Sequence, residues 1–185
     1  MIRPLTLTLL LTCSLTLLVA APGCRGTDPR PLEIGDRAPG FDLPAVAGGV
    51  GRLSSNQFKG QIVVLNFWST SCSVCLKETE DLARIHEGHR ARVVSIALDS
   101  DPDDLRKFVK EKGIPYSVLV GNEQVFSQFD GYAIPYTLVL DRSGVVRRKA
   151  YGRIESEELT RVIEKIDGSQ VALRPQTVAL TSSTR

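Results

Sequence analysis

The chain has 185 residues, a net charge of +2 at pH 7 and a hydrophobic fraction of 42%. This length fits one domain with extensions, and the apolar content is sufficient for a globular core. The small net charge argues against a nucleic-acid partner, which a strongly basic surface would favour.

The first 24 residues have the pattern of an export signal. Arg3 precedes an apolar stretch from Leu5 to Ala21, and small residues follow as far as Cys24. This order is typical of a secretory signal. The Gly-Cys step resembles the bacterial lipobox, whose cysteine is lipidated, so we expect a protein anchored by lipid at the periplasmic or extracytoplasmic face of a bacterial cell envelope. A soluble export signal and an uncleaved anchor remain alternatives, because 17 residues are close to the minimum for a membrane span.

Composition divides the rest of the chain into three parts. Residues 25–33 contain Gly, Thr, Asp and Pro and are predicted to form a tether. Residues 34–168 are predicted to fold as one domain, and residues 169–185 to form a flexible tail. Within the domain, residues 35–51 indicate a loop and a short hairpin, and residues 53–58 a turn of helix.

Strand and helix patterns alternate through the domain. The apolar run at residues 62–67 is typical of a central strand covered on both faces, and a helix-favouring segment follows at Ser73–Glu87. Asp101 before Pro102 is predicted to cap a helix rather than bind calcium, because the acidic cluster lacks the spacing of a calcium loop. The remaining predicted elements are a strand at 92–98, a helix at 102–112, a strand at 116–120, a short helix at 123–129, a hairpin of strands at 137–140 and 145–151, and a helix at 155–166. Parallel strand-helix-strand units followed by an antiparallel hairpin predict an α/β domain with a mixed sheet.

Two cysteines, Cys72 and Cys75, stand at the start of the helix predicted after the central strand. Their spacing places both on one helix face, close enough to join in a redox-active disulfide. The unpaired N–H groups of a helix start favour a thiolate over a thiol. Since the thiolate is the nucleophile in disulfide exchange, we predict that Cys72 attacks and Cys75 resolves.

A Cys-x-x-Cys pair is also half of a zinc site, which needs two further Cys or His ligands. The other cysteines, Cys13 and Cys24, lie in or just after the N-terminal apolar stretch, and His86 and His89 lie more than a helical turn beyond the pair. We therefore expect no metal, and no cofactor other than the disulfide itself.

Three motifs carry a resemblance to a known family: Leu65-Asn66-Phe67-Trp68-x-Thr70-x-Cys72-x-x-Cys75-x-Lys77-Glu78, Ile134-Pro135, and Ala38-Pro39-Gly40-Phe41-Asp42-Leu43. With them the sequence resembles the TlpA/ResA-like branch of envelope thiol-disulfide oxidoreductases in the thioredoxin superfamily, over about residues 33–167. The resemblance implies a thioredoxin fold, in which helices flank a central mixed sheet, with an N-terminal hairpin extension and a central α/β insertion.

The resemblance also implies roles for residues around the dithiol. It places the active-site glutamate of that branch at Glu78, where partial burial would raise the pKa and suit a base; a glutamate stabilised by the helix dipole is the alternative. It makes the bond between Ile134 and Pro135 cis, with the preceding backbone pairing with a bound substrate chain. Trp68 is expected to form an apolar wall beside the cysteines, or to be an ordinary core aromatic.

By resemblance, the chain would act as a reductant on exported cysteine-containing proteins such as apocytochrome c. A membrane thiol donor would supply its electrons, an N-terminal anchor would hold it at the membrane, and we expect a monomer. One alternative is a peroxiredoxin-like thiol peroxidase, which shares the Ala-Pro-x-Phe opening; peroxiredoxins have Thr three residues and Pro seven residues before the reactive cysteine, where this chain has Ser69 and Leu65. The other is a non-enzymatic metal-binding or adaptor domain, against which the scarcity of Met and His near the pair argues.

Overall fold

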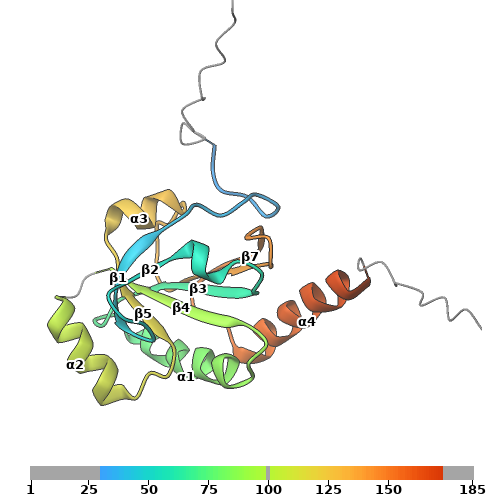
Figure 1. The fold of residues 1–185 in the computed structure, drawn as a ribbon. Helices are drawn as coiled ribbons and strands as arrows, with labels where there is room; N and C mark the ends of the chain where they lie inside the picture. Colours follow the sequence, from blue (N-terminus) through green and yellow to red (C-terminus); the bar gives the residue numbers. More distant parts are fainter. Residues whose placement is uncertain (1–29, 99–100, 173–185) are drawn as a thin grey trace, which may run out of the picture. The chain divides into compact units, whose positions relative to one another are not determined.

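The computed structural model describes residues 30–98 and 101–172 (Figure 1). The predicted signal at residues 1–24, with Cys24, lies outside the described residues, as do most of the predicted tether and the end of the predicted tail. The helices and strands of the described residues all belong to one unit, residues 31–185. Among the described residues, no helix is both long enough and apolar enough to cross a bilayer.

A seven-stranded mixed sheet forms the centre of this unit in the described chain, in the order β2-β1-β5-β4-β3-β6-β7. Three strands run parallel at its middle, and a hairpin of two strands lies antiparallel at each side. The parallel strands are β3 (Val63–Trp68), β4 (Arg92–Ala97) and β5 (Ser117–Val120); the hairpins are β1 (Asp42–Ala47) with β2 (Arg52–Ser54), and β6 (Tyr136–Leu140) with β7 (Val146–Tyr151).

Helices cover both faces of the sheet (Figure 1). On one face, α1 (Ser73–Glu87), α2 (Pro102–Lys112) and α4 (Ser156–Ala172) contribute Leu82, Leu105 and Leu159 to a single apolar cluster. On the other face, α3 (Glu123–Gln128) and the short 3-10 helix η1 (Ser55–Phe58) contribute Val125 and Phe58 to a second cluster. The core therefore has two layers, one above and one below the sheet.

Side chains along β3 alternate between the two faces of the sheet, and this determines which of them face α1. Val64 and Trp68 belong to the cluster on the α1 face, whereas Leu65 and Phe67 belong to the opposite cluster. Because successive side chains of a strand point to opposite faces, Asn66 is directed toward α1.

Two neighbouring strands place polar side chains beside Asn66. Thr137 of β6 and Ser95 of β4 pair with Asn66 in the sheet register, and both side chains are buried. Thr137, Asn66 and Ser95 thus form a line across three strands on the α1 face, here named the polar row. It interrupts an otherwise apolar layer directly below the helix that carries the dithiol.

The predicted order of elements and the thioredoxin fold are confirmed. The N-terminal hairpin is displaced from its predicted position, since β2 takes residues 52–54 and leaves the helical turn to residues 55–58, with Ser54 as a capping residue. The last helix was predicted to end at Ile166, and this was wrong because α4 continues to Ala172. Gly168 does not adopt the left-handed backbone that ends α2 at Gly113, and a glycine inside a helix costs only about 1 kcal/mol relative to alanine.

Candidate active site

The dithiol occupies the start of α1 as a disulfide between Cys72 and Cys75. Cys72 is the N-cap residue, with an extended backbone, and its Sγ accepts a hydrogen bond of 3.2 Å from the backbone N–H of Cys75. The sulfur thus occupies the place of the side-chain oxygen that usually caps a helix. One of the free N–H groups of the helix start is directed at the predicted attacking atom.

The two sulfur-bearing residues differ in exposure. Cys72 is half-buried, whereas Cys75 is 2% exposed and belongs to the core cluster on the α1 face. A disulfide partner from another chain can therefore reach the first cysteine more easily than the second. This asymmetry is what an attacking and a resolving thiol require.

Glu78 lies one helical turn after Cys75 and is fully buried above the polar row. Its Oε1 accepts hydrogen bonds of 3.1 Å from Thr137 Oγ1 and from the backbone N–H of Ile154. Its Oε2 accepts a bond of 3.1 Å from Asn66 Nδ2. Three donors from three separate parts of the chain therefore hold this carboxyl in place.

The polar row is itself hydrogen-bonded, which fixes the direction of each group. Asn66 Nδ2 also donates to Thr137 Oγ1 at 3.0 Å, and Ser95 Oγ donates to Asn66 Oδ1 at 3.5 Å. The Asn66 amide is therefore oriented with its nitrogen toward Glu78. Asn66 cannot accept a proton at its amide nitrogen, but it serves the glutamate as a donor.

Burial raises the pKa of Glu78 from 4.5 to about 7. The hydrogen bonds from Ile154, Thr137 and Asn66 act in the opposite direction, and the nearby Asp81 carboxylate adds to the rise. The loss of hydration outweighs the three donors. Glu78 is therefore a carboxyl that can both take and release a proton near neutral pH.

The hydrogen bonds also indicate which oxygen of Glu78 can carry a proton. Oε1 already accepts two bonds, whereas Oε2 accepts one. A carboxyl oxygen has two lone pairs, so the remaining capacity lies on Oε2.

The other predicted site residues lie around the same apolar cluster. The peptide bond between Ile134 and Pro135 is cis, as the resemblance implied. Ile134, like Cys72, is partly buried and packs against the cluster that contains Cys75. Trp68 is 1% exposed, belongs to that cluster and contacts Phe108, with ring centroids 6.0 Å apart. Trp68 is thus part of the core wall on the α1 face, and its contact with a bound substrate stays a prediction.

Sequence reasoning missed several buried polar residues near Glu78. Asp81, one turn further along α1, is 1% exposed and accepts hydrogen bonds from Arg153 and from the backbone N–H of Ser156. Tyr116 is 1% exposed, and burial together with the nearby Glu78 raises the pKa of its hydroxyl. The i, i+3 spacing from Glu78 could have indicated Asp81, because it places a second acid on the inner face of the helix.

Within residues 30–98 and 101–172, no group of three or more His, Cys, Asp or Glu residues is arranged to hold a metal ion. His86 and His89 lie near the far end of α1, away from the dithiol in sequence. The chemistry that the described residues offer is that of a dithiol beside a buried carboxyl.

Comparison with known proteins gives consistent similarities. Residues 34–149 match the profile of the AhpC/TSA family. The chain is 29% identical over 139 residues to the thiol-disulfide oxidoreductase ResA of Bacillus thuringiensis subsp. konkukian (strain 97-27), covering 73% of this chain and 79% of that protein. It is 27% identical over 152 residues to the thiol:disulfide interchange protein DsbE of Allochromatium vinosum, covering 77% of this chain and 84% of that protein.

Solved structures with the same fold include a DsbF homologue from Corynebacterium diphtheriae. That structure has 27% sequence identity and a TM-score of 0.64, and the match covers 78% of this chain and 96% of that chain.

Proposed function

The chain belongs to the AhpC/TSA family and is a TlpA/ResA-like thiol-disulfide oxidoreductase of the thioredoxin superfamily, and from this we propose that it reduces disulfides in exported proteins at the extracytoplasmic side of a bacterial membrane. The proposal is supported chiefly by one observation: a half-buried Cys72 caps α1, while its partner Cys75 is buried one turn before a buried glutamate.

In the first step, the reduced protein attacks with the Cys72 thiolate. The new bond joins Cys72 Sγ to one sulfur of the substrate disulfide, and the other substrate sulfur leaves as a thiolate that takes a proton from water. The Cys75 N–H that now donates to Cys72 Sγ supports the negative charge before attack.

In the second step, Cys75 resolves the mixed disulfide. Its thiol gives a proton to Oε2 of Glu78, its sulfur attacks Cys72 Sγ, and the second substrate sulfur leaves as a thiolate. The substrate has then gained two electrons, and the protein holds the Cys72–Cys75 disulfide. An external thiol donor must reduce this disulfide before the next cycle.

The raised proton affinity of Glu78 suits this second step. A free cysteine has a pKa of about 8.5, so transfer to a carboxyl with the ordinary pKa of 4.5 is uphill by about 4 units. Transfer to a carboxyl with a pKa of about 7 is uphill by only about 1.5 units. Burial of Glu78 therefore converts a weak base into an effective one.

Trapping tests the exchange mechanism. A Cys75→Ser protein, reduced and then mixed with an oxidised peptide, should accumulate a mixed disulfide through Cys72, whereas Cys72→Ser should accumulate none. Failure of Cys75→Ser to capture the peptide would exclude the proposed order of attack. Peroxide consumption by the wild-type protein, measured in parallel, tests the thiol peroxidase alternative.

Two finer proposals concern the substrate and the anchor. For apocytochrome c as substrate, an oxidised Cys-x-x-Cys-His peptide should react faster than a disulfide peptide of the same length without the histidine; equal rates would contradict this choice.

For lipid attachment at Cys24, cells fed a labelled fatty acid should label the wild type and a Cys13→Ser variant, but not Cys24→Ser. Labelling of Cys24→Ser would contradict attachment at that residue.

A further inference from the structure

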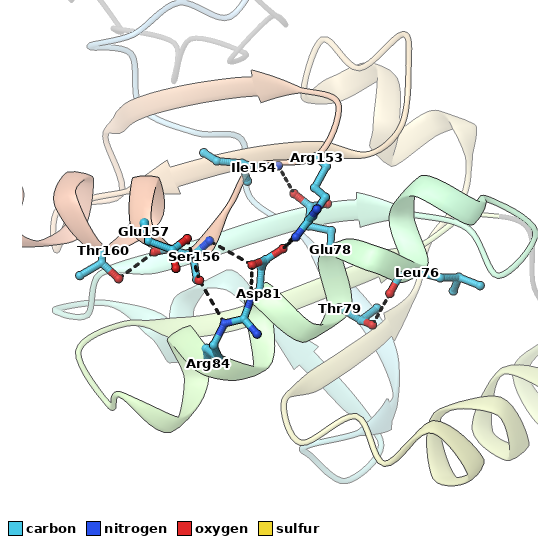
Figure 2. Close-up of polar contacts among 10 residues, drawn as sticks. All are labelled: Leu76, Glu78, Thr79, Asp81, Arg84, Arg153, Ile154, Ser156, Glu157 and Thr160. Carbon is cyan, nitrogen blue, oxygen red and sulfur yellow. Dashed lines mark hydrogen bonds and ion pairs between the residues drawn. The ribbon is translucent and has the colours of Figure 1, made fainter.

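A second buried carboxylate lies one turn beyond Glu78. Asp81 is 1% exposed; its Oδ2 accepts a hydrogen bond of 2.8 Å from Arg153 Nε and forms an ion pair of 2.8 Å with Arg153 Nη2. Its Oδ1 accepts a bond of 3.2 Å from the backbone N–H of Ser156 and a further bond from Arg84. Figure 2 shows Asp81 between the two arginines, close to the glutamate.

The donors from Arg153 and Ser156 stand on either side of Ile154. All three belong to the connection between β7 and α4 or to the first residue of α4. Since the N–H of Ile154 donates to Glu78 Oε1, this connection meets α1 at three nearby points: two bonds to Asp81 flank one bond to Glu78 (Figure 2).

The same connection is also joined to the cis-proline segment. The N–H of Gly152 donates to the carbonyl of Pro135 at 2.9 Å. Gly152 has a φ of 80°, which a residue with a side chain rarely adopts. A single four-residue segment, residues 152–155, therefore links the two sides of the predicted active site.

Several ionisable groups face Glu78 or act on it at this place. From α1 it is Asp81, from the segment before β5 it is Tyr116, and from the β7–α4 connection it is Arg153 through Asp81. Cys75, one turn before Glu78 on α1, is held in the disulfide and does not ionise in this state. β3 and β6 contribute only the neutral groups of the polar row.

The charge of Asp81 follows from its partners. Burial alone would raise the pKa of Asp81, but the hydrogen bonds from Arg153, the Ser156 N–H and Arg84 hold it below its ordinary value. Asp81 is therefore an anion at neutral pH. An anion beside Glu78 disfavours a second negative charge, and the Arg153 cation offsets this effect.

We propose that Arg153 is a positioning residue for disulfide exchange: by binding Asp81 it holds the β7–α4 connection against α1, keeps the Ile154 N–H on Glu78, and so sets how readily Glu78 accepts a proton. The assignment rests on the proposed function, in which that proton comes from Cys75. Arg153 touches neither sulfur nor substrate in this scheme, and it acts only through Asp81 and the backbone of Ile154.

The substitution Arg153→Gln tests this role with little change in shape. It removes the cation and leaves Asp81 unopposed on that side, and it loosens the Ile154 donor; both effects make Glu78 harder to ionise. We expect the titration midpoint of Glu78 to rise by roughly half a pH unit or more. Arg153→Lys keeps the cation and should restore the midpoint most of the way.

Arg90→Gln is the matched control. Arg90 forms a 2.8 Å ion pair with Glu164 of α4, so its loss also removes an arginine-carboxylate contact to that helix, but not one near the dithiol. Its Glu78 midpoint should equal that of the wild type. If Arg153 only attached α4 to the sheet, Arg153→Gln would lower the free energy of unfolding but leave the Glu78 titration midpoint unchanged.

The measurement is the 13C NMR shift of the Glu78 carboxyl against pH, in the oxidised full chain. Because the disulfide is intact, this titration needs no exchange activity. The prediction for the Glu78 midpoint can therefore be contradicted while Cys75→Ser still traps the peptide, and trapping can fail while the midpoint shifts as expected. Equal midpoints in Arg153→Gln and the wild type would overturn the proposal.

Should Arg153→Gln not fold, Ser156→Pro replaces it. Proline is well tolerated at the first position of a helix, and it removes the N–H that binds Asp81 together with the hydroxyl that accepts from Arg84 and donates to Glu157. Ser156→Ala, which removes the hydroxyl alone, is therefore its reference. The Glu78 midpoint of Ser156→Pro should again rise, and an unchanged midpoint in this proline variant would equally refute the role of the connection.

Discussion

The hydroxyl of Thr137 serves two neighbours at once. It donates to Glu78 Oε1 and accepts from Asn66 Nδ2, and the residue is fully buried. Valine has nearly the same shape but can do neither. Replacing this hydroxyl with a methyl group therefore removes one of the three hydrogen-bond donors to Glu78.

Thr137→Val should raise the pKa of Glu78 above about 7 and destabilise the fold by about 1–3 kcal/mol, since it leaves one buried N–H of Asn66 with no acceptor. Urea unfolding at pH 5 and the Glu78 titration measure the two effects. Ser95→Ala is the comparison within the same polar row, because the Ser95 hydroxyl donates to Asn66 Oδ1 at 3.5 Å and no hydrogen bond given for the described residues joins it to Glu78. Equal midpoints in the valine variant and the wild type would show that the threonine does not tune the glutamate.

Glu78→Gln should slow resolution of the mixed disulfide by roughly tenfold or more at pH 7, because the buried proton acceptor is lost. The pH–rate profile of the variant should lose its inflection near pH 7, and the domain should stay folded. Single-turnover release of a trapped peptide gives the rate. The control is Glu80→Gln, an exposed position on the same helix, and an unaltered profile for the Glu78 variant would remove it from the mechanism.

Helices α1 and α2 begin in contrasting ways. The N-cap of α1 is a sulfur, whose hydrogen bond serves the chemistry of the dithiol. The N-cap of α2 is Asp101, whose carboxylate accepts from the N–H groups of residues 103 and 104, with Pro102 at the first position. The capping role predicted for Asp101 is confirmed, and this cap contributes to stability alone.

Asp101→Ala should therefore cost about 1 kcal/mol of unfolding free energy and leave exchange rates unchanged. Urea denaturation measures the loss. Asp104→Ala, which removes a first-turn acid without a capping bond, should cost only a few tenths of a kcal/mol. A larger loss for Asp104→Ala than for Asp101→Ala would contradict the assignment of the cap.

At the scale of the whole molecule, buried acids of opposite behaviour set the dependence of stability on pH. Asp81 and Asp141 are both buried, yet their hydrogen-bond donors outweigh desolvation and lower the pKa of each. Their carboxylates stabilise the fold at pH values above the ordinary aspartate pKa of 3.8. This stabilisation is lost as the pH falls and the carboxylates become protonated. Glu78 behaves in reverse: its contribution is complete below its ordinary pKa of 4.5 and is lost as the pH rises through about 7.

The difference in unfolding free energy between wild type and Glu78→Gln should therefore change between pH 5 and pH 8. A pKa raised from 4.5 to about 7 corresponds to a change on the order of 3 kcal/mol, in the direction that disfavours the wild type at high pH. The comparison removes the effect of His86, whose lowered pKa makes stability rise with pH in both proteins. Unfolding of the oxidised proteins at several pH values measures it, and a constant difference would contradict the burial effect.

The sequence predicted those parts of the site that are local in the chain. Cys72 and Cys75 lie at the start of one helix, and capping and spacing rules apply there. The role of Glu78, three residues further on, came from the family resemblance, because spacing alone left a glutamate that stabilises the helix dipole as an alternative. Thr137 and Ile154 come from 59 and 76 residues beyond Glu78, and no short-range pattern indicates such partners. The strand of Asn66 was predicted as a continuous apolar run, but its role as a donor depends on which face of the sheet meets α1.

The three donors to Glu78 arrive from β3, β6 and the β7–α4 connection, and these segments meet only when the sheet is assembled. Until then Glu78 is a hydrated carboxylate, and Cys75 has no buried base to accept its proton. Resolution of a mixed disulfide through Cys75 is therefore a property of the assembled sheet, whereas the support for the Cys72 sulfur lies within the first turn of a single helix.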